Sequence, residues 1–290
     1  MFGSTVLELA IGLIFTFLTI SLITSATTES IASALSWRAN TLLQGVKDLL
    51  NDQQFTGLAL SLYNHSLVNA RANGNASTVQ QLTAKPSYID PKQFACALID
   101  VIGLLPNANV QTLQAKVNTA VPDKQLNAML NGMVERAGGN IDRIRDDIAA
   151  WFDSGMGRVA GAYKRKTQLW SFIIALTCAI ALNIDTVKIA RALWNEPIVI
   201  KGTSSPPPAG ETAAKQALDQ LQELGLPFGW DAAARSDLLK TGPRENFWLN
   251  LNWLYAVVGW FISAVATLFG APFWFDSLQK FVQLRGAGSN

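Results

Sequence analysis

Apolar residues are concentrated in three long segments of the chain, and the stretches between them carry apolar positions at helical spacing. The first segment runs from Val6 to Thr24 with Glu8 as its only charge, and the others cover residues 168–187 and 247–275. About 20 mainly apolar residues are needed to cross a hydrocarbon core of about 30 Å. The pattern therefore predicts three transmembrane helices, the first of them within residues 1–25.

Apolar positions continue beyond the first span at intervals that keep them on one face of a helix. Ile31, Leu35, Leu42, Val46 and Leu49 follow one another at spacings of 4, 7, 4 and 3 residues. These spacings predict that the first span continues without interruption as a single helix to about residue 50.

Residues 26–167 are expected to form a compact helical domain between the first two spans. Pro91 and the pair Pro122-Asp123 are typical of a helix start, whereas Gly138-Gly139 is typical of a helix end. The chain has no sustained period-two alternation, which is the pattern of a half-buried strand. The predicted fold class is all-α, an integral membrane protein with three transmembrane helices and a helical cytoplasmic domain between the first two.

Basic residues set the expected orientation, because Lys and Arg are enriched in cytoplasmic loops. Lys164, Arg165 and Lys166 directly precede the second span, and no basic residue precedes the first. We therefore expect the N-terminus outside and residues 26–167 inside. Residues 188–246 would form an outer loop with a proline-rich linker and a short helix near 212–224, and residues 276–290 an interfacial cytoplasmic tail. A cleaved signal peptide is the alternative for the first segment, but Glu8 and the absence of a basic start disfavour it.

Composition supports a membrane protein and excludes several classes of function. Apolar residues make up 49% of the chain and charged residues 15%, whereas soluble domains are about 25% charged. A net charge of +2 is too small for a nucleic-acid-binding surface. One His and two Cys exclude most His/Cys metal clusters and a disulfide framework, so no metal site and no cofactor are expected.

A group of polar residues is predicted to lie at one leaflet of the membrane. Its members are Glu8 on the first span, Asn183 and Asp185 at the end of the second, and Asn250 and Asn252 at the start of the third. Intramembrane acids are costly and often functional, so this group could move a proton or an ion. Alternatively, Asp185 lies at the headgroup level paired with Lys188, and the asparagines hydrogen bond between helices.

The sequence Trp-Phe-Asp-Ser occurs twice, shortly before the second span and just after the third. The residues of interest are Trp151 and Asp153 in the first copy and Trp274 and Asp276 in the second. Each Asp is predicted to cap the N-terminus of a following helix, with the aromatic side chains at the membrane interface. The alternative is a paired docking surface for a partner.

Two further features have simple structural interpretations. His65 is the only histidine, and no acid or nucleophile beside it in the sequence makes it a catalytic residue. Gly157 and Gly161 have the small-xxx-small spacing that suits close helix packing. No catalytic residue is assigned.

The chain resembles a widespread family of uncharacterised bacterial inner-membrane proteins. The matching stretches lie at residues 7–50, 61–68, 86–102, 151–168, 181–194 and 270–288, and include SLYNHSLV, WFDSGMGRVAGAYKRKTQ and ALNIDTVKIARALW. The resemblance implies a multi-pass protein of the bacterial inner membrane. The family has no established activity, so it implies no mechanism.

Three functions remain open at the level of the sequence. The first is a non-enzymatic membrane anchor or scaffold whose helical domain holds a cytoplasmic protein partner, or copies of itself as a homo-oligomer, at the lipid bilayer. The second is an oligomeric channel or ion-coupled transport subunit, in which Asp185 and its polar neighbours would line the route. The third, a membrane-embedded enzyme, lacks the expected clusters of His and carboxylates and is the least favoured.

Overall fold

A computed structural model describes residues 2–195, 216, 219, 226–230 and 251–287, and every regular element in these residues is a helix. The all-α fold class is therefore confirmed. The chain divides into two compact units, the first made of Met1–Ala34 with Lys166–Asn290 and the second of Leu35–Arg165. The short helix predicted near residues 212–224 and the proline-rich linker lie outside the described residues.

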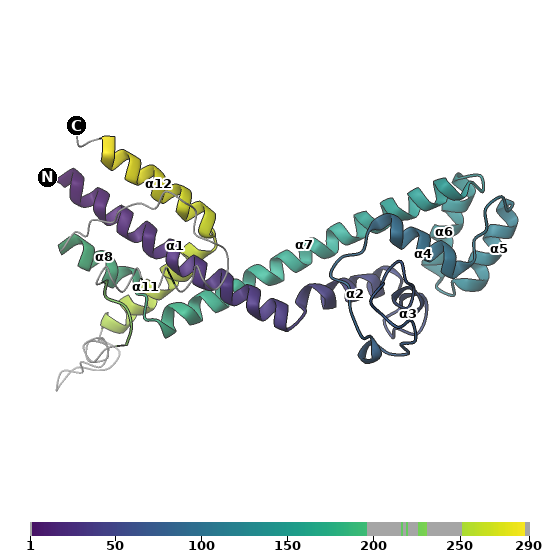
Figure 1. The fold of residues 1–290 in the computed structure, drawn as a ribbon, viewed down its shortest axis with the longest axis horizontal. Helices are drawn as coiled ribbons and strands as arrows, with labels where there is room; N and C mark the ends of the chain where they lie inside the picture. Colours follow the sequence, from purple (N-terminus) through teal and green to yellow (C-terminus); the bar gives the residue numbers. More distant parts are fainter. Residues whose placement is uncertain (1, 196–215, 217–218, 220–225, 231–250, 288–290) are drawn as a thin grey trace. The chain divides into compact units, whose positions relative to one another are not determined.

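The helices divide between the units as follows (Figure 1). The first unit contains α1 (Phe2–Ala34), the C-terminal part of α7 (Ile141–Ala181), α8 (Thr186–Asn195), α11 (Leu251–Thr267) and α12 (Ala271–Ala287). The second contains α2 (Trp37–Leu49), α3 (Leu58–Tyr63), the 3₁₀ turn η1 (Val79–Gln81), α4 (Pro91–Ile102), α5 (Val110–Ala120), α6 (Lys124–Arg136) and the N-terminal part of α7.

The predicted single helix to about residue 50 is wrong, because the chain breaks at Leu35 and Ser36. Ser36 adopts the left-handed conformation, with φ 49° and ψ 40°, which ends one helix and starts the next. The Asn40 side chain donates to the carbonyl oxygen of Leu35 at 3.1 Å and so satisfies a group that the break would leave free. Apolar spacing alone does not reveal such a break, since the apolar face resumes after it.

Helix starts in the second unit follow local signals in the sequence. The Asp90 side chain caps α4, Asn109 caps α5 and Asp123 caps α6, as the Pro91 and Pro122-Asp123 patterns predict for the first and last of these. The Leu126 backbone N–H and then the Asn51 side chain lower the pKa of Asp123. These hydrogen bonds contribute to the folding stability above the pKa of Asp123 in the unfolded chain. That contribution is lost as the pH falls through the lower pKa of Asp123 in the folded chain.

A single hydrophobic core fills the second unit. Phe94 of α4 stacks on Phe152 of α7 with ring centroids 3.9 Å apart and planes 15° apart, and both side chains are buried. Helices α2 and α7 approach closely at two glycines. An added Cβ at Gly155 would come within 2.7 Å of Leu49, and one at Gly45 within 2.7 Å of Val159. The core therefore fixes α7 against both α2 and α4.

The first unit is built around α1, which packs against α8, α11 and α12. Two of its helix pairs are bent: α7 and α8 meet at 52°, and α11 and α12 meet at 97°. Gly270 makes the second turn with φ 82°, and the indole of Trp274 donates to the carbonyl oxygen of Ala266 across it at 2.7 Å. The predicted third span at residues 247–275 thus corresponds to α11 and the start of α12, with residues 247–250 outside the described part.

One helix is long and apolar enough by itself to cross a membrane. It is Thr5–Ala34, with a mean hydropathy of 2.4 in its most apolar window. Each bent pair has the required length and composition only when its two helices are taken together, so the described residues contain one candidate span, or up to three if each bent pair is one span.

Replacing Phe152 with Ala is expected to destabilise the second unit by about 3–5 kcal/mol, because it leaves a cavity beside Phe94. Leu105→Ala is the control, since Leu105 is 59% exposed and such surface changes usually stay within about 0.5 kcal/mol. The stability of each variant is measured by hydrogen exchange of the α4 backbone amides in the detergent-solubilised full chain. Equal protection of α4 in the two variants would contradict this account of the core.

Candidate functional site

The break between α7 and α8 is one candidate site, because polar side chains from the break and from α11 meet there. Asn183 lies in the break in the left-handed conformation, with φ 48°. Its amide nitrogen donates to the carbonyl oxygen of Gly229 at 2.9 Å, and its amide oxygen accepts from the indole of Trp260 at 3.1 Å. The backbone N–H of Gly229 in turn donates to the carbonyl oxygen of Leu182 at 2.8 Å. Asn183 thereby connects the break to α11 and to residues 226–230.

Asp185 is the N-cap of α8. One carboxylate oxygen accepts from the backbone N–H groups of Val187 at 2.9 Å and Lys188 at 3.2 Å. The residue is only 7% exposed. A helix N-terminus stabilises a carboxylate in this position through its free N–H groups and its partial positive charge. The salt bridges formed within the described residues do not include Asp185, so its contact with Lys188 is through the backbone.

Helix α11 approaches the Asp185 carboxylate so closely that only a glycine fits at the contact. A Cβ added at Gly259 would overlap the carboxylate and would lie 3.2 Å from the backbone nitrogen of Thr186. One turn later, the Ser263 hydroxyl lies 2.7 Å from the Thr186 hydroxyl and 2.8 Å from the carbonyl oxygen of Ile184. These contacts provide hydrogen-bond partners for polar groups of the break. They hold the end of α7 and the start of α8 against α11.

The structure brings only part of the predicted polar group together. Asn183 and Asp185 share the break and are both buried. Glu8 lies half-buried on α1, and its side chain forms no hydrogen bond or ion pair with any other described residue. Asn250 lies outside the described residues, and so does the side chain of Asn252. Sequence reasoning missed Gly259, Trp260 and Ser263 as partners of the break, because nothing local to α11 points to residues nearly 80 positions away.

Both copies of Trp-Phe-Asp-Ser lie inside helices, so the predicted N-caps are wrong. Asp153 lies within α7 and Asp276 within α12, and both side chains are exposed. Trp151 and Trp274 are half-buried, whereas the following Phe is the buried member of each copy. Helix phase explains the difference, since it turns the Phe toward the core and the adjacent Asp toward the surface.

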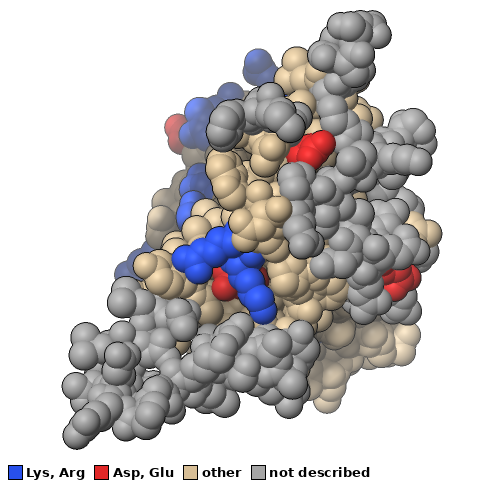
Figure 2. Space-filling model, turned by 90° about the vertical axis from the view of Figure 1, so that its left-hand side faces the viewer, with Lys and Arg blue, Asp and Glu red and all other residues tan. Residues whose placement is uncertain are grey.

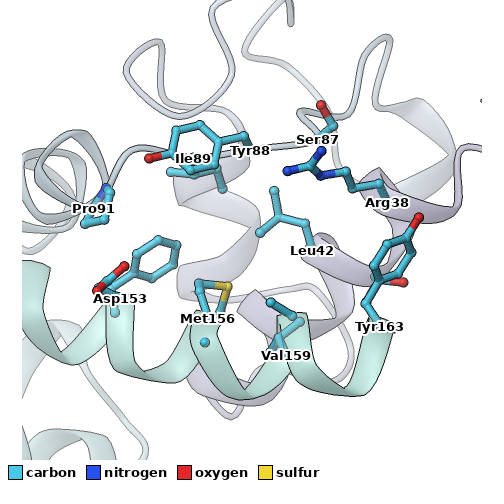
Figure 3. A pocket seen from close by; sticks show the side chains of 14 residues that line it. Arg38, Leu42, Ser87, Tyr88, Ile89, Pro91, Asp153, Met156, Val159 and Tyr163 are labelled. Carbon is cyan, nitrogen blue, oxygen red and sulfur yellow. The ribbon is translucent and has the colours of Figure 1, made fainter. Parts of the chain in front are cut away.

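A pocket of about 440 Å³ in the second unit is the other candidate site (Figure 3). Its walls come from α2, from the segment before α4 and from α7. The lining residues are Arg38, Thr41, Leu42, Ser87, Tyr88, Ile89, Pro91, Phe152, Asp153, Met156, Gly157, Val159, Ala160 and Tyr163. Sequence reasoning did not find this pocket, because three segments distant in the chain form it.

The charged groups of this pocket lie at opposite ends. In Figure 3 the Arg38 guanidinium reaches over Leu42 toward Ser87, while Asp153 lies at the far end beside Pro91. The guanidinium forms no hydrogen bond or ion pair with any other residue in the described ranges. An unpaired cation at one end and a carboxylate at the other give the pocket an electrical polarity.

Gly157 lines the pocket rather than packing against a helix. A Cβ added there would meet no atom within 4 Å, and one at Gly161 would meet only the end of Arg165 at 3.8 Å. The close helix contact predicted for this pair is therefore absent among the described residues, and Gly155 makes such a contact instead.

His65 pairs with a carboxylate at the surface of the second unit. Its Nε2 lies 3.5 Å from Asp100, and its Nδ1 accepts from the backbone N–H of Leu67 at 3.3 Å. The Asp100 side chain is 59% exposed. Such an open pair lacks the enclosure that makes a general base effective.

Replacing Gly259 with Ala is expected to destabilise the first unit by about 1–3 kcal/mol, since the new methyl group would displace Asp185 or push α11 away from α8. Gly157→Ala is the matched control, because it enters open space and improves helix propensity by about 1 kcal/mol. Thermal unfolding in detergent should therefore change in opposite directions for the two variants. Unchanged stability of Gly259→Ala would show that the close contact is not maintained in solution.

Comparisons with known proteins found no match among protein-family models, among curated proteins or among solved structures. No relative therefore assigns a role to the polar break or to the pocket, and the resemblance to bacterial inner-membrane proteins stays an expectation. What the chain does has to be inferred from its own side chains and their geometry.

Proposed function

We propose that the chain is a non-enzymatic membrane anchor or scaffold, whose first unit lies in a bilayer and holds the helical second unit at the membrane surface. The distribution of exposed apolar side chains carries this proposal. Among the large apolar side chains exposed in the described part of the chain, all but Leu35, Leu67, Tyr88 and Leu105 belong to the first unit.

The exposed apolar side chains of the first unit form helical faces of the kind that lipid covers. On α7 they include Leu169, Ile173 and Ile180, which are 60%, 42% and 40% exposed. On α11 they are Leu254, Tyr255, Val257, Val258, Phe261 and Ile262. Water would be a poor solvent for such a surface, because each exposed square ångström of apolar area costs about 25 cal/mol.

The packing of α1 supports a permanent span over a cleaved signal peptide. Ile11, Ile14, Phe15, Leu18 and Ile20 are buried in the core of the first unit. Removing α1 would expose this core along α8, α11 and α12. The hydroxyls of Thr16, Thr19 and Thr27 on this helix bond to carbonyl oxygens one turn earlier. The hydroxyls of Ser21, Thr24 and Thr28 are buried without a hydrogen-bond partner among the described residues.

The three-span interpretation remains part of the proposal. A span interrupted by a helix break is stable in lipid only when neighbouring groups satisfy the freed backbone atoms. The break at Asn183–Asp185 meets this condition through Gly229, Trp260 and Ser263. Lys164, Arg165 and Lys166, all exposed on α7, favour a cytoplasmic second unit with the N-terminus outside, in a bacterial inner membrane.

The same break argues against the channel alternative. An ion route needs polar groups that face a water-filled path, whereas Asn183, Ser263 and one carboxylate oxygen of Asp185 are engaged in hydrogen bonds within the break and with neighbouring segments. On the face shown in Figure 2, one acidic group lies beside basic atoms near the centre, whereas other acidic groups lie apart from any basic atom.

Insertion of the full chain into membranes is the test of the anchor. The chain is expected to stay in the membrane fraction during carbonate extraction. Val258→Arg should reduce insertion, because an Arg at the centre of a span costs about 2.5–3.5 kcal/mol, and Leu105→Arg in the second unit is the matched control. Release of the unaltered chain by carbonate, or equal insertion of both variants, would contradict the proposal.

The scaffold part of the proposal concerns what the second unit holds. Cross-linking in intact cells followed by a pull-down from detergent extract is expected to recover a cytoplasmic partner, or native mass to show more than one copy of the chain. A monomer that brings down no partner would leave the anchor in place and exclude the scaffold.

A further inference from the structure

We propose that the pocket of the second unit binds a single-chain amphiphile, with its anionic head group at Arg38 and its hydrocarbon chain along α7 toward Asp153. The inference deepens the proposed function and rests on it for the choice of a membrane-derived ligand. The pocket volume of about 440 Å³ falls within the usual range for small-molecule sites, about 300–1,000 Å³.

The shape of the pocket favours an extended ligand. One wall runs along α7 from Phe152 to Tyr163, and this stretch of helix rises by about 16 Å. The middle of the pocket is apolar, with Leu42, Met156 and Val159 directed into it (Figure 3). A hydrocarbon chain laid along this wall would be stabilised because its methylene groups are removed from water.

The chemistry of the walls favours an alkyl chain over a bound peptide segment. A peptide in this groove would bring N–H and C=O groups that require hydrogen-bond partners when buried. The polar side chains of the lining are Arg38, Thr41, Ser87, Tyr88, Asp153 and Tyr163. Leu42, Met156 and Val159, in the middle of the pocket, offer no hydrogen-bond partner. An alkyl chain has no group to satisfy there.

The charges at the two ends give the ligand a direction. Arg38 is the cationic lining residue and is free of ion pairs within the described residues, whereas Asp153 would repel an anion from the other end. The basic run Lys164–Lys166 follows Tyr163 on the same helix and adds positive charge near the Arg38 end. A carboxylate or phosphate head group would therefore be attracted to Arg38.

The position of the pocket in the chain indicates where such a ligand comes from. Arg38 follows the last residue of α1 by four positions, and Tyr163 precedes the exposed apolar stretch of α7, which starts at Leu169, by six. If the first unit lies in the bilayer, the mouth of the pocket is connected to the membrane by short segments of chain. A fatty acid and a lysophospholipid share the required chemistry and would both be available there.

Binding of myristate to the full chain in nanodiscs of zwitterionic lipid is the first test. Native mass spectrometry, with empty discs as the baseline, is expected to show one saturable site for myristate and for lysophosphatidylglycerol. Myristyl alcohol should bind at least about tenfold more weakly, since a charge-assisted hydrogen bond is lost. Equal binding of the alcohol, or binding of an acidic decapeptide instead of myristate, would overturn the proposal.

Filling the pocket is the second test, and the chain offers a matched pair of glycines. Gly157→Leu places a side chain into the open space of the pocket and improves helix propensity, so the variant should fold. It is expected to lower myristate affinity by at least tenfold. Gly161→Leu, one turn further along α7 and outside the pocket lining, should bind as the unaltered chain does. Equal effects of the two variants would show that the ligand lies elsewhere.

Charge substitutions test the direction of the ligand. Arg38→Gln is expected to weaken myristate binding about tenfold, whereas Arg136→Gln on α6, outside the pocket, should leave it unchanged. Asp153→Asn should leave affinity unchanged or raise it, because it removes a repulsive charge. A loss of binding in Asp153→Asn as large as that in Arg38→Gln would contradict the proposed orientation.

Failure of this inference can be told from failure of the proposed function. A chain that resists carbonate extraction but binds no myristate retains the anchor and loses the amphiphile site. If the chain binds myristate in a way that depends on Arg38 but is released from membranes by carbonate, the amphiphile site is supported and the membrane anchor is contradicted.

Discussion

Pairing of backbone and side-chain polar groups at the break between α7 and α8 is the constraint on which the first unit depends. Two helix ends meet there in apolar surroundings, and unpaired N–H or C=O groups at such a place cost several kcal/mol each. Asp185 and Asn183 supply the partners from the break itself, and Trp260 and Ser263 supply them from α11. These contacts hold the 52° bend after which α8 packs against α1. There Leu193 lies 2.5 Å from the position that a Cβ would take at Gly12.

Local signals in the sequence were sufficient to predict where helices of the second unit begin. They were insufficient to predict the helix breaks at Ser36 and Asn183. Pro91 and Asp123 mark helix starts because each acts on its immediate neighbours. The break at Ser36 has no such marker, since a serine adopts the left-handed conformation only when the surrounding structure stabilises it. The partners of Asn183 could not be predicted either, because a hydrogen bond to Trp260 depends on how α11 packs rather than on any local pattern.

The candidate sites could likewise be predicted only where they depend on neighbouring residues in the sequence, and not where they depend on tertiary packing. Trp-Phe-Asp-Ser reads as a capping sequence, but each copy lies in mid-helix and its Phe faces a core. Asp185 was identified from its position at the end of an apolar run, and the structure gives it a role in capping α8. The pocket was invisible to sequence reasoning because Arg38, Ile89 and Met156 come together only after three segments have packed.

The surroundings of each glycine show whether packing requires it, which the spacing of glycines in the sequence does not reveal. A Cβ at Gly259 would collide with Asp185 and crowd the backbone nitrogen of Thr186, and one at Gly155 would displace the end of the Leu49 side chain, so packing favours a glycine at both positions. Gly157 meets no neighbour and lies on a helix, where glycine lowers stability relative to alanine by about 1 kcal/mol. Packing does not require a glycine there, and a larger residue would occupy the pocket beside it. The open space beside Gly157 is therefore available to a ligand, whereas the side chains of Asn183 and Ser263 at the break are engaged with other groups of the protein.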